Sequence, residues 1–562
     1  MSSDIGEKAR AVFLVALMVL SVVAMTTVFA GSAAAAASTV TVDDDGSSDH
    51  DSVQAAVDSE GSDTIIEVAD GTYDETVTFD GSESNVTIEA SDPANPPEIT
   101  GGVSIKSSAS DLTIENVELS GVAAADRTFQ VAGGSLENVT FDGVTFEGDD
   151  TVNSAIYGND FTGSVTLTGV NVANYTVDDW RFMNINTQST IDNVEITGST
   201  FQDSTGMIAF GEISNNVTIE DNTFSGIDQD SSETAAAALA LGEPALGDSL
   251  TASISGNTFR DNFNHVVLDD VDGETIQSIV NSNDFDRTAS DDRLISPSIQ
   301  NVVDSADSGD TISVGPGTYN ESVSISTANL TLESTAGADE TIINSSSTDR
   351  TNIQEAANDV TIEGFSFVFD DQAIYVRADN VTIQNNAFEL ADDTESQGYA
   401  VRYEGLTSDG VLRENTFTGI SNTVEDEFGN GVVIAGPDGH EITDNTFTNN
   451  SIGVNVGSSQ PAGTLQIANN TFTQQDDFGI ALNHDDGSSP NFDITNNDIE
   501  SNPIGILVLA DGDIDVHDNN IVDSSNLGVD ATAITDTQIN ATSNWWGSQN
   551  GPAADTNTYN DT

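Results

Sequence analysis

The chain has 562 residues, and its 94 acidic residues against 12 basic ones give a formal net charge of −82. Nucleic acid is not expected as a partner, because phosphate binding needs a basic stripe that this composition lacks. Cysteine is absent, which excludes disulfides and thiolate metal sites. At roughly 1 M salt the Debye length falls to about 3 Å, so the charge indicates adaptation to concentrated salt. Disorder is the alternative, but 37% of the residues are apolar and they recur in periodic strands.

The first 37 residues are predicted to be an export signal. Lys8 and Arg10 precede an almost wholly apolar run, Ala11–Ala30, and small residues follow at Ala33–Ala37. A retained anchor is the alternative, because about 20 apolar residues can span a bilayer. The segment resembles the signal peptides of haloarchaeal surface glycoproteins. We therefore expect a secreted or cell-surface protein with no membrane span once the signal is removed.

The opening of the mature chain occurs twice, with an offset of 246 residues. Ser52–Asp58 aligns with Ser298–Asp304, and Gly71–Glu75 aligns with Gly317–Glu321. Each copy predicts a short amphipathic helix, a first strand, a Gly-Thr-Tyr turn and a second strand. The predicted first strands are Ile65–Val68 and Thr311–Val314.

A helix at the start of a stack of strands has a physical purpose, because it covers unpaired backbone groups and the apolar interior. Two such openings predict two tandem domains, residues 38–290 and 291–562, after the signal at 1–37. The alternative is one continuous stack with the second helix displaced outward.

A short phrase, an Asn followed one or two residues later by Phe or Ile, recurs through the second half at intervals of 22 to 30 residues. Such a period predicts a solenoid of strands in which each coil is one repeat. An Asn at a fixed turn position can tolerate the left-handed conformation and can bond its counterpart in the next coil. The Phe or Ile should point inward and stack. The recurring residues are Asn386, Asn415, Asn445, Asn470, Asn497 and Asn519.

These features resemble secreted archaeal right-handed parallel β-helix proteins of the pectin-lyase-like superfamily. The resemblance rests on the helix from Ser298, the GPGTYNESVSI segment at 315–325, the Asn-Val-Thr-Ile strands, the Asp-Asn-Thr-Phe coils and the segment NWWGSQNGP at 544–552. It implies an all-β fold of two tandem right-handed parallel β-helices. It does not select a function, because the fold carries lyases, hydrolases, adhesins and copper-associated periplasmic proteins.

Two arginines form the main candidate site. Aligning Ile374–Arg377 with Tyr399–Arg402 predicts that Arg377 and Arg402 occupy the same outward position in successive coils. Polysaccharide lyases of the superfamily use Arg or Lys as a base and basic residues or Ca²⁺ to neutralise a uronate carboxylate. The resemblance therefore implies catalytic roles for both arginines. The alternative is that they neutralise an acidic ridge and cover it with their stems. The nearby aromatic residues that would bind carbohydrate are Tyr375, Tyr399 and Tyr403.

Acidic residues give weaker candidates. Adjacent carboxylates on a strand point to opposite faces, so a sequential pair is not by itself a glycosidase site. In Asp511–His517 the alternate residues Asp511, Asp513, Asp515 and His517 face outward, but their spacing of about 7 Å is too wide to share one ion. We expect a solvated acidic face there. Five His and five Met in the whole chain are few for copper. The acid pairs are Asp178-Asp179, Asp269-Asp270 and Asp485-Asp486.

Twelve Asn-x-Ser/Thr sequons are candidate glycan acceptors. At Asn85, Asn138, Asn216 and Asn380 the sequence Asn-Val-Thr is also what a turn entering a half-buried strand requires. We expect a minority of the twelve to be modified. The favoured acceptors are Asn174, Asn320, Asn344, Asn449, Asn469 and Asn540, and the last two sequons are at Asn329 and Asn560.

The sequence therefore predicts a salt-adapted extracellular β-helix that acts as a structural, adhesive or carbohydrate-binding module. Its expected partner is an extracellular polysaccharide or a cell-envelope glycan, and we expect a monomer. The alternative is a polysaccharide lyase, or a related carbohydrate-active enzyme, centred on Arg377 and Arg402. No cofactor is required by the sequence, although Ca²⁺ would suit the lyase hypothesis.

Overall fold

The structure is a computed structural model, and it describes residues 37–560 with several gaps. The signal predicted for residues 1–37 lies, except for its last residue, outside the described residues. Within the described part of the chain, no helix is both long and apolar enough to cross a membrane. The gaps are 124–126, 150, 178–180, 186–190, 211–212, 229–236, 242–250, 269–272, 292–293, 345–350, 392–397, 422–428, 437, 458–462, 484–489, 511, 533, 535–538, 550, 552 and 556–557.

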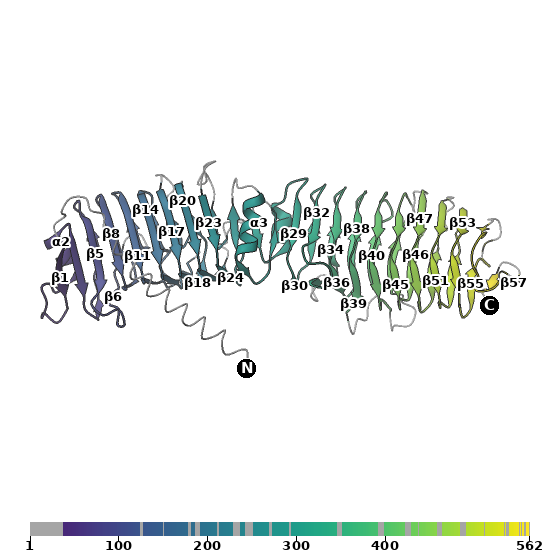
Figure 1. Ribbon diagram of the computed structural model, residues 1–562, viewed down its shortest axis with the longest axis horizontal. Coiled ribbons are helices and arrows are strands. Elements are labelled where there is room, and N and C mark those ends of the chain that lie inside the picture. Colours follow the sequence, from purple (N-terminus) through teal and green to yellow (C-terminus); the bar gives the residue numbers. More distant parts are fainter. Residues whose placement is uncertain are drawn as a thin grey trace, which may run out of the picture.

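The chain winds into an elongated right-handed parallel β-helix, which confirms the predicted fold class (Figure 1). Strands run across the long axis, and each coil adds one strand to each of three sheets. Buried apolar side chains form two clusters along the interior, one from Val40 to Ile295 and one from Ala289 to Trp546. We call residues 38–290 the N-terminal half and residues 291–562 the C-terminal half.

The N-terminal half has three parallel sheets. Its first sheet consists of β1 (Ser38–Val42), β2 (Thr64–Val68), β5 (Ser84–Ala90), β8 (Ala109–Glu115), β11 (Leu136–Asp142), β14 (Phe161–Thr168), β17 (Ile191–Thr197), β20 (Ile213–Glu220) and β23 (Thr251–Ser255). Its second sheet consists of β3 (Thr72–Tyr73), β6 (Glu98–Ile99), β9 (Glu118–Ser120), β12 (Thr145–Glu147), β15 (Asn171–Ala173), β18 (Thr200–Thr205), β21 (Thr223–Asp228), β24 (Thr258–Arg260) and β26 (Asp284–Phe285). Its third sheet consists of β4 (Val77–Phe79), β7 (Val103–Ile105), β10 (Arg127–Val131), β13 (Ser154–Gly158), β16 (Met183–Ile185), β19 (Ile208–Phe210), β22 (Leu239–Leu241) and β25 (Val266–Leu268).

The C-terminal half repeats this plan. Its first sheet consists of β29 (Thr311–Val314), β32 (Thr331–Ser334), β35 (Thr361–Glu363), β38 (Thr382–Gln384), β41 (Val411–Arg413), β44 (Glu441–Thr443), β47 (Thr464–Ala468), β50 (Asn491–Thr495), β53 (Asp513–His517) and β56 (Ile539–Asn540). Its second sheet consists of β30 (Gly317–Tyr319), β33 (Thr341–Asn344), β36 (Ser366–Phe369), β39 (Ala387–Leu390), β42 (Thr416–Thr418), β45 (Thr446–Thr448), β48 (Thr471–Thr473), β51 (Asp498–Glu500) and β54 (Asn520–Val522). Its third sheet consists of β31 (Val323–Ile325), β34 (Thr351–Glu355), β37 (Gln372–Val376), β40 (Tyr399–Tyr403), β43 (Asn430–Ile434), β46 (Ile452–Val456), β49 (Phe478–Leu482), β52 (Ile504–Val508) and β55 (Leu527–Asp530), with β57 (Ala553–Asp555) and β58 (Thr558–Asn560) added antiparallel.

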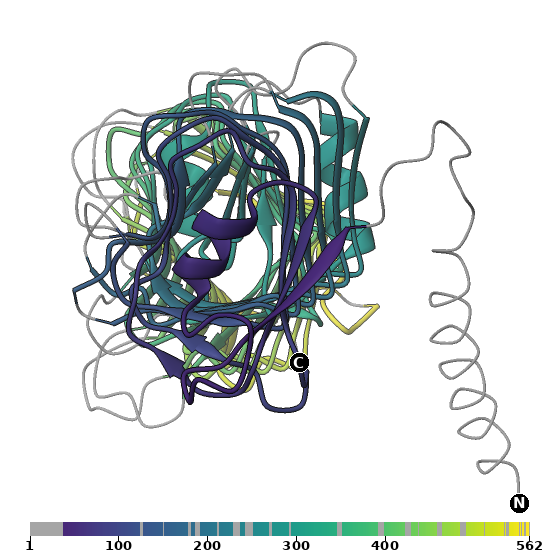
Figure 2. The same cartoon turned by 90° about the vertical axis from the view of Figure 1, so that its left-hand side faces the viewer.

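The repeated opening forms the two predicted helices, α2 (Val53–Glu60) and α4 (Ile299–Ser305). Figure 2 shows α2 across the open end of the first coil. A Glu from the following turn accepts hydrogen bonds from the first backbone N–H groups of each helix: Glu75 for α2 and Glu321 for α4. A carboxylate is favourable at a helix N-terminus. The repeated Gly-Thr-Tyr-x-Glu phrase is therefore the anchor of the capping helix.

The halves meet at a short antiparallel connection. The third sheet of the N-terminal half ends at β25, which pairs antiparallel with β28 (Leu294–Ser296). Strand β27 (Ala289–Ser290) pairs with both β28 and β29, so the ladder continues into the first sheet of the C-terminal half. Helix α3 (Gly273–Ser282), which the sequence analysis did not predict, precedes this connection.

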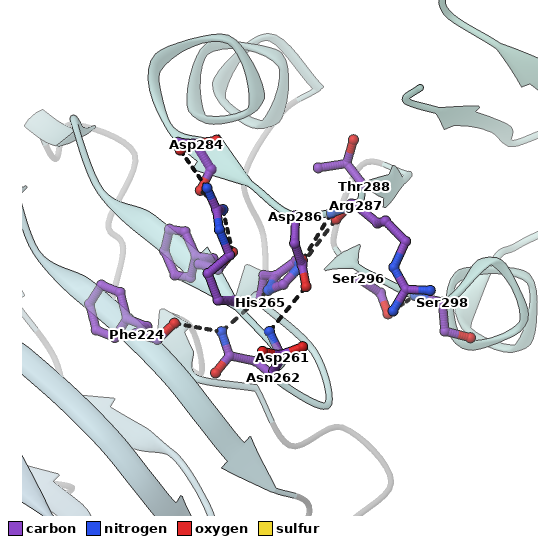
Figure 3. Close-up of polar contacts among 12 residues, drawn as sticks. Phe224, Asp261, Asn262, His265, Asp284, Asp286, Arg287, Thr288, Ser296 and Ser298 are labelled. Atoms are coloured by element: carbon purple, nitrogen blue, oxygen red, sulfur yellow. Dashed lines mark hydrogen bonds and ion pairs between the residues drawn. The ribbon is translucent and has the colours of Figure 1, made fainter. Parts of the chain in front are cut away.

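Polar side chains fix the junction, as Figure 3 shows. The fully buried His265 is 3.1 Å from a carboxylate oxygen of Asp286. Burial opposes ionisation of Asp286, but hydrogen bonds from His265 and the Asp261 N–H hold its pKa well below the ordinary value. Beside them, Arg260 is 2.5 Å from Asp284. The switch from parallel to antiparallel pairing therefore occurs beside two paired carboxylates, Asp284 and Asp286.

The recurring Asn residues form a buried ladder. Each side-chain oxygen accepts the backbone N–H of the preceding Asn, as between Asn415 and Asn445 at 3.0 Å, and the ladder runs from Asn386 to Asn544. The ladder Asn residues do not use their tolerance of the left-handed conformation. Positive φ occurs one residue earlier, for example at Glu414 and Asp444, because the ladder Asn must keep its side chain aimed along the stack.

Phenylalanines stack inside the C-terminal half, and all but the first, Phe367, lie two residues after a ladder Asn. The centroids of Phe367, Phe388, Phe417, Phe447 and Phe472 are 4.6–5.1 Å apart in successive pairs, with nearly parallel rings. This confirms the predicted inward stack. On the facing third sheet, Gly residues make room: a Cβ on Gly453 would lie 2.6 Å from the Phe472 ring.

Candidate functional site

The third sheet of each half differs from the other sheets in charge. None of its strands in the N-terminal half, β4 to β25, contains Asp or Glu. In the C-terminal half, β31 to β55 contain only the buried Glu355 and the terminal Asp530. In a chain with 94 acidic residues, a face free of carboxylates is where an anionic ligand meets the least repulsion.

The first sheet shows the contrast. Glu67, Glu89 and Glu115 stand side by side on β2, β5 and β8. Partial burial and repulsion from the two flanking carboxylates raise the pKa of Glu89. Carboxylates at this spacing repel anions and suit a hydrated surface in concentrated salt.

Four side chains on β37 and β40 form a cluster, which we call the C-terminal quartet. The register pairs Gln372 with Tyr399 and Tyr375 with Arg402. All four side chains are half-buried on the outer face of the third sheet. The guanidinium carbon of Arg402 is 5.4 Å from the ring centroid of Tyr375 and 5.8 Å from that of Tyr399. The quartet thus joins a cation to two aromatic faces.

The structure corrects the predicted alignment of the two arginines. Arg402 pairs with Tyr375, two residues earlier than Arg377, so the arginines do not occupy the same position. Arg377 instead forms an ion pair with Glu404 at 3.3 Å, and its guanidinium carbon is 5.8 Å from the Tyr375 centroid. Both members of that ion pair are about half exposed.

Tyr403 is also misplaced by the sequence alignment. Its side chain is 1% exposed and points into the solenoid, so its ring does not lie beside the arginines on the outer face. Burial raises the pKa of its hydroxyl. The physical reason is the alternation of the strand: Arg402 faces outward, so its neighbour Tyr403 must face inward.

Inside the solenoid, Tyr403 has two buried titratable neighbours. Its ring centroid is 4.8 Å from that of His440. Burial lowers the pKa of His440, whose ring nitrogens bond the Gly410 N–H and the Thr407 carbonyl. Glu355 is 0% exposed, and burial raises its pKa to about 7 although it accepts the Ala357 N–H. These groups are enclosed and do not form part of the surface site.

The described residues contain no group of three His, Asp or Glu side chains placed to share a metal ion. On β53, Asp513 is exposed and Ile514 and Val516 are buried, as the predicted alternation requires. His517 bonds Asp518 at 2.9 Å and lies 3.5 Å from Asp493. The hydrogen bond to Asp518 raises the pKa of His517, so it is poorly suited to ligate a cation. Asp511 lies outside the described residues.

Other sequence candidates fall outside the quartet. The pairs Asp178-Asp179, Asp269-Asp270 and Asp485-Asp486 lie outside the described residues. Asn380 adopts positive φ just before β38, as its Asn-Val-Thr context predicts. Asn85 and Asn138 also adopt positive φ, but within β5 and β11, and Asn216 lies within β20 without positive φ. Among the favoured sequons, Asn344 is half-buried. The exposed ones are Asn174, Asn320, Asn449, Asn469 and Asn540.

Comparisons with known proteins give one family and several structures. Residues 303–551 match the family described as "Periplasmic copper-binding protein (NosD)". No curated protein matches the chain. The PL6 family alginate lyase AlyGC aligns with a TM-score of 0.29 and 10% identity, over 87% of this chain and 98% of that one. The alginate lyase AlyF-OU02, solved with G6, gives 0.21 and 12%, over 79% and 81%.

Proposed function

We propose that this chain is an exported, salt-adapted β-helix protein that binds an acidic polysaccharide at the C-terminal quartet. The observation that carries the proposal is the pairing of Arg402 with Tyr375 on a sheet face without outward carboxylates over eight coils. A protein that binds the polysaccharide without cleaving it would have a structural, adhesive role in the cell envelope.

The quartet has the groups that a sugar acid needs. The planar guanidinium of Arg402 can hold a carboxylate through two parallel hydrogen bonds. The rings of Tyr375 and Tyr399 offer flat apolar faces for a sugar ring. Acidic residues stand at the edges of the face, with Asp371 before β37 and Glu404 after β40. They confine the electrostatic attraction for a polyuronate to the surroundings of Arg402.

The same face continues as an uncharged track. Beyond Arg402, the corresponding position of successive third-sheet strands is occupied by Val433, Asn455, Ala481 and Leu507. Val433, Asn455 and Leu507 are half-buried, whereas Ala481 is fully covered by its neighbours. Stacked strands are about 4.8 Å apart, so this track is extended and regular. A linear polysaccharide running along the coils would meet no outward carboxylate on these strands.

Neither metal is part of the proposal. Copper binding is stated for the matched family, and the described residues of this chain offer no cluster to hold it. Ca²⁺ prefers carboxylate oxygens, which the four side chains of the quartet lack. Export is supported by the apolar segment 11–30 and by the periplasmic description of the matched family.

The test is titration calorimetry of the full mature chain with a soluble polyuronate in concentrated KCl. Arg402→Ala should weaken binding about tenfold, which is about 1.4 kcal/mol. Arg413→Ala is the matched control, because Arg413 lies on the outer face of the first sheet and bonds Gln384. Equal affinity of Arg402→Ala and wild type would overturn the proposal.

The same samples separate binding from lysis. A lyase would release unsaturated uronates, which absorb in the ultraviolet, and this activity would fall in Arg402→Ala and in Arg377→Ala. A steady absorbance together with Arg402-dependent binding is the expected result. Release of unsaturated product would replace the binding module with the enzyme.

A further inference from the structure

The N-terminal half carries a second cluster at the same coil positions. The third and fourth strands of the third sheet are β10 and β13 in the N-terminal half, and β37 and β40 in the C-terminal half. Each pair of strands provides four outward positions. On β10 and β13 the register pairs Arg127 with Ser154 and Gln130 with Tyr157. We call these four residues the N-terminal quartet. Sequence reasoning missed it because Arg127 and Tyr157 lie 30 positions apart without a shared motif.

The two quartets share an arginine, a glutamine and a tyrosine in exchanged places, but the buried Ser154 stands where the C-terminal quartet has Tyr399. Arg127 occupies the position of Gln372, and Tyr157 occupies the position of Arg402. The guanidinium carbon of Arg127 lies 3.7 Å from the centroid of the Tyr157 ring, closer than either contact of Arg402. An arginine held over a tyrosine is therefore present in both halves, although the residues that form it differ.

Each quartet also contains a glutamine with an unused acceptor. The side-chain oxygens of Gln130 and Gln372 are buried, and neither has a hydrogen-bond donor among the described residues. A buried acceptor without a donor costs free energy that a ligand hydroxyl could recover. Carboxylate, ring face and hydroxyl are the three groups of a sugar acid, and each quartet offers a partner for all three.

Basic residues also lie near the N-terminal quartet. The strands of this sheet contain no acidic residue. Of the 12 basic residues in the whole chain, Lys106 directly follows β7 and Arg181 lies just before β16, so both flank the quartet. Lys106 is exposed. Acidic residues accompany these cations in the sequence, with Asp126 before Arg127 and Asp178-Asp179 before Arg181, so the absence of carboxylates holds for the strands alone.

We propose that Arg127, Gln130 and Tyr157 form a second binding site for a uronate-containing polysaccharide. This inference rests on the proposed function of the C-terminal quartet and extends it. The third sheet of the N-terminal half continues through β28 and β27 into the first sheet of the C-terminal half. The two quartets therefore lie on different sheets, and one polymer laid straight along a face cannot contact both. The protein cross-bridges two polysaccharide strands.

Two measurements test the second site on the full mature chain in concentrated KCl. Calorimetry with a short oligouronate should give two sites per chain for the wild type, one for Arg127→Ala, one for Arg402→Ala and none for the double variant. Light scattering with a long polyuronate reports cross-bridging. It should rise for the wild type and for Arg413→Ala, and it should stay flat for either single variant.

The outcomes separate this inference from the proposed function. One site per chain that only Arg402→Ala removes would overturn the second site and leave the proposed function intact. Absence of binding by the wild type would overturn both. If Arg127→Ala still raises the light scattering of the long polyuronate, chains with one site each must cross-bridge by associating with one another. That result would also overturn the inference. If thermal unfolding shows that Arg127→Ala is misfolded, Arg127→Lys replaces it, because lysine keeps the charge but loses the planar fork.

Discussion

Arg402 pairs with Tyr375 across β37 and β40, and the guanidinium carbon lies 5.4 Å from the ring centroid. The two residues come from consecutive coils, so the stacking of coils, and not local sequence, creates the contact. Each contributes a different property: the cation binds a carboxylate, and the ring both positions the cation and offers an apolar face. This division of roles predicts how variants at Tyr375 should behave.

Tyr375→Ala should weaken polyuronate binding at the C-terminal quartet, because it removes the ring that packs against Arg402 and the face on which a sugar stacks. We expect a loss of about 1 kcal/mol, or about fivefold in affinity. Tyr375→Phe keeps the ring and should bind like the wild type. Calorimetry of both variants measures this, and a strong loss in Tyr375→Phe would mean that the hydroxyl, not the ring, makes the contact.

The Asn ladder should be a main determinant of stability in the C-terminal half. The side chain of Asn445 is 1% exposed, bonds the Leu412 and Thr443 carbonyls and accepts the Asn415 N–H. Asn445→Ala leaves these groups buried without partners, at a cost on the order of 3 kcal/mol. The exposed Asn320→Ala is the control. Denaturant unfolding compares them, and equal midpoints would show that the ladder adds little stability.

The fold could be predicted from this sequence because its determinants are local and repeated. Asn and Phe recur at a fixed distance within each coil, and a strand that alternates polar and apolar residues needs no distant information. The register of the third sheet is different. Val-Arg occurs at the end of β37, where Arg377 follows the strand, and again inside β40, and matching that dipeptide shifts the alignment by two residues.

Interior packing sets the true register. In the observed register Ala373 lies beside Ala400. Gly431 and Gly453 occupy the same position in the next two strands, so the four form a column of small residues that faces the phenylalanine stack. Aligning the small residues would have placed Tyr375 beside Arg402. The N-terminal quartet had no comparable signal, because exchanged Arg and Tyr positions leave no common motif between the halves.

The two halves are predicted to unfold separately. Each has its own cluster of buried apolar residues and its own capping helix, and the antiparallel ladder between them is short. Scanning calorimetry should show two transitions in concentrated KCl. Asn445→Ala should lower only the transition of the C-terminal half. One transition that Asn445→Ala shifts as a whole would instead indicate a single cooperative stack.

Glu355 should make the C-terminal half less stable as pH rises. Its pKa is about 7 in the folded chain against 4.5 for the free side chain, because burial disfavours the charged form. The folded state therefore retains a proton that the unfolded state has released, and stability falls as pH rises from about 4.5 through about 7. A shift of this size corresponds to about 3 kcal/mol at alkaline pH.

Glu355→Gln tests this directly, because glutamine keeps the shape and can never ionise. The variant and the wild type should have similar stability near pH 4.5, and the variant should become the more stable by about 3 kcal/mol above pH 7. Glu441→Gln removes an exposed carboxylate on β44 and controls for the loss of one negative charge. Taking the difference between proteins at each pH cancels the titration of the remaining carboxylates. A Glu355→Gln difference that is the same at all pH values would show that Glu355 is ionised in the folded chain and that water or a cation reaches the interior beside Tyr403.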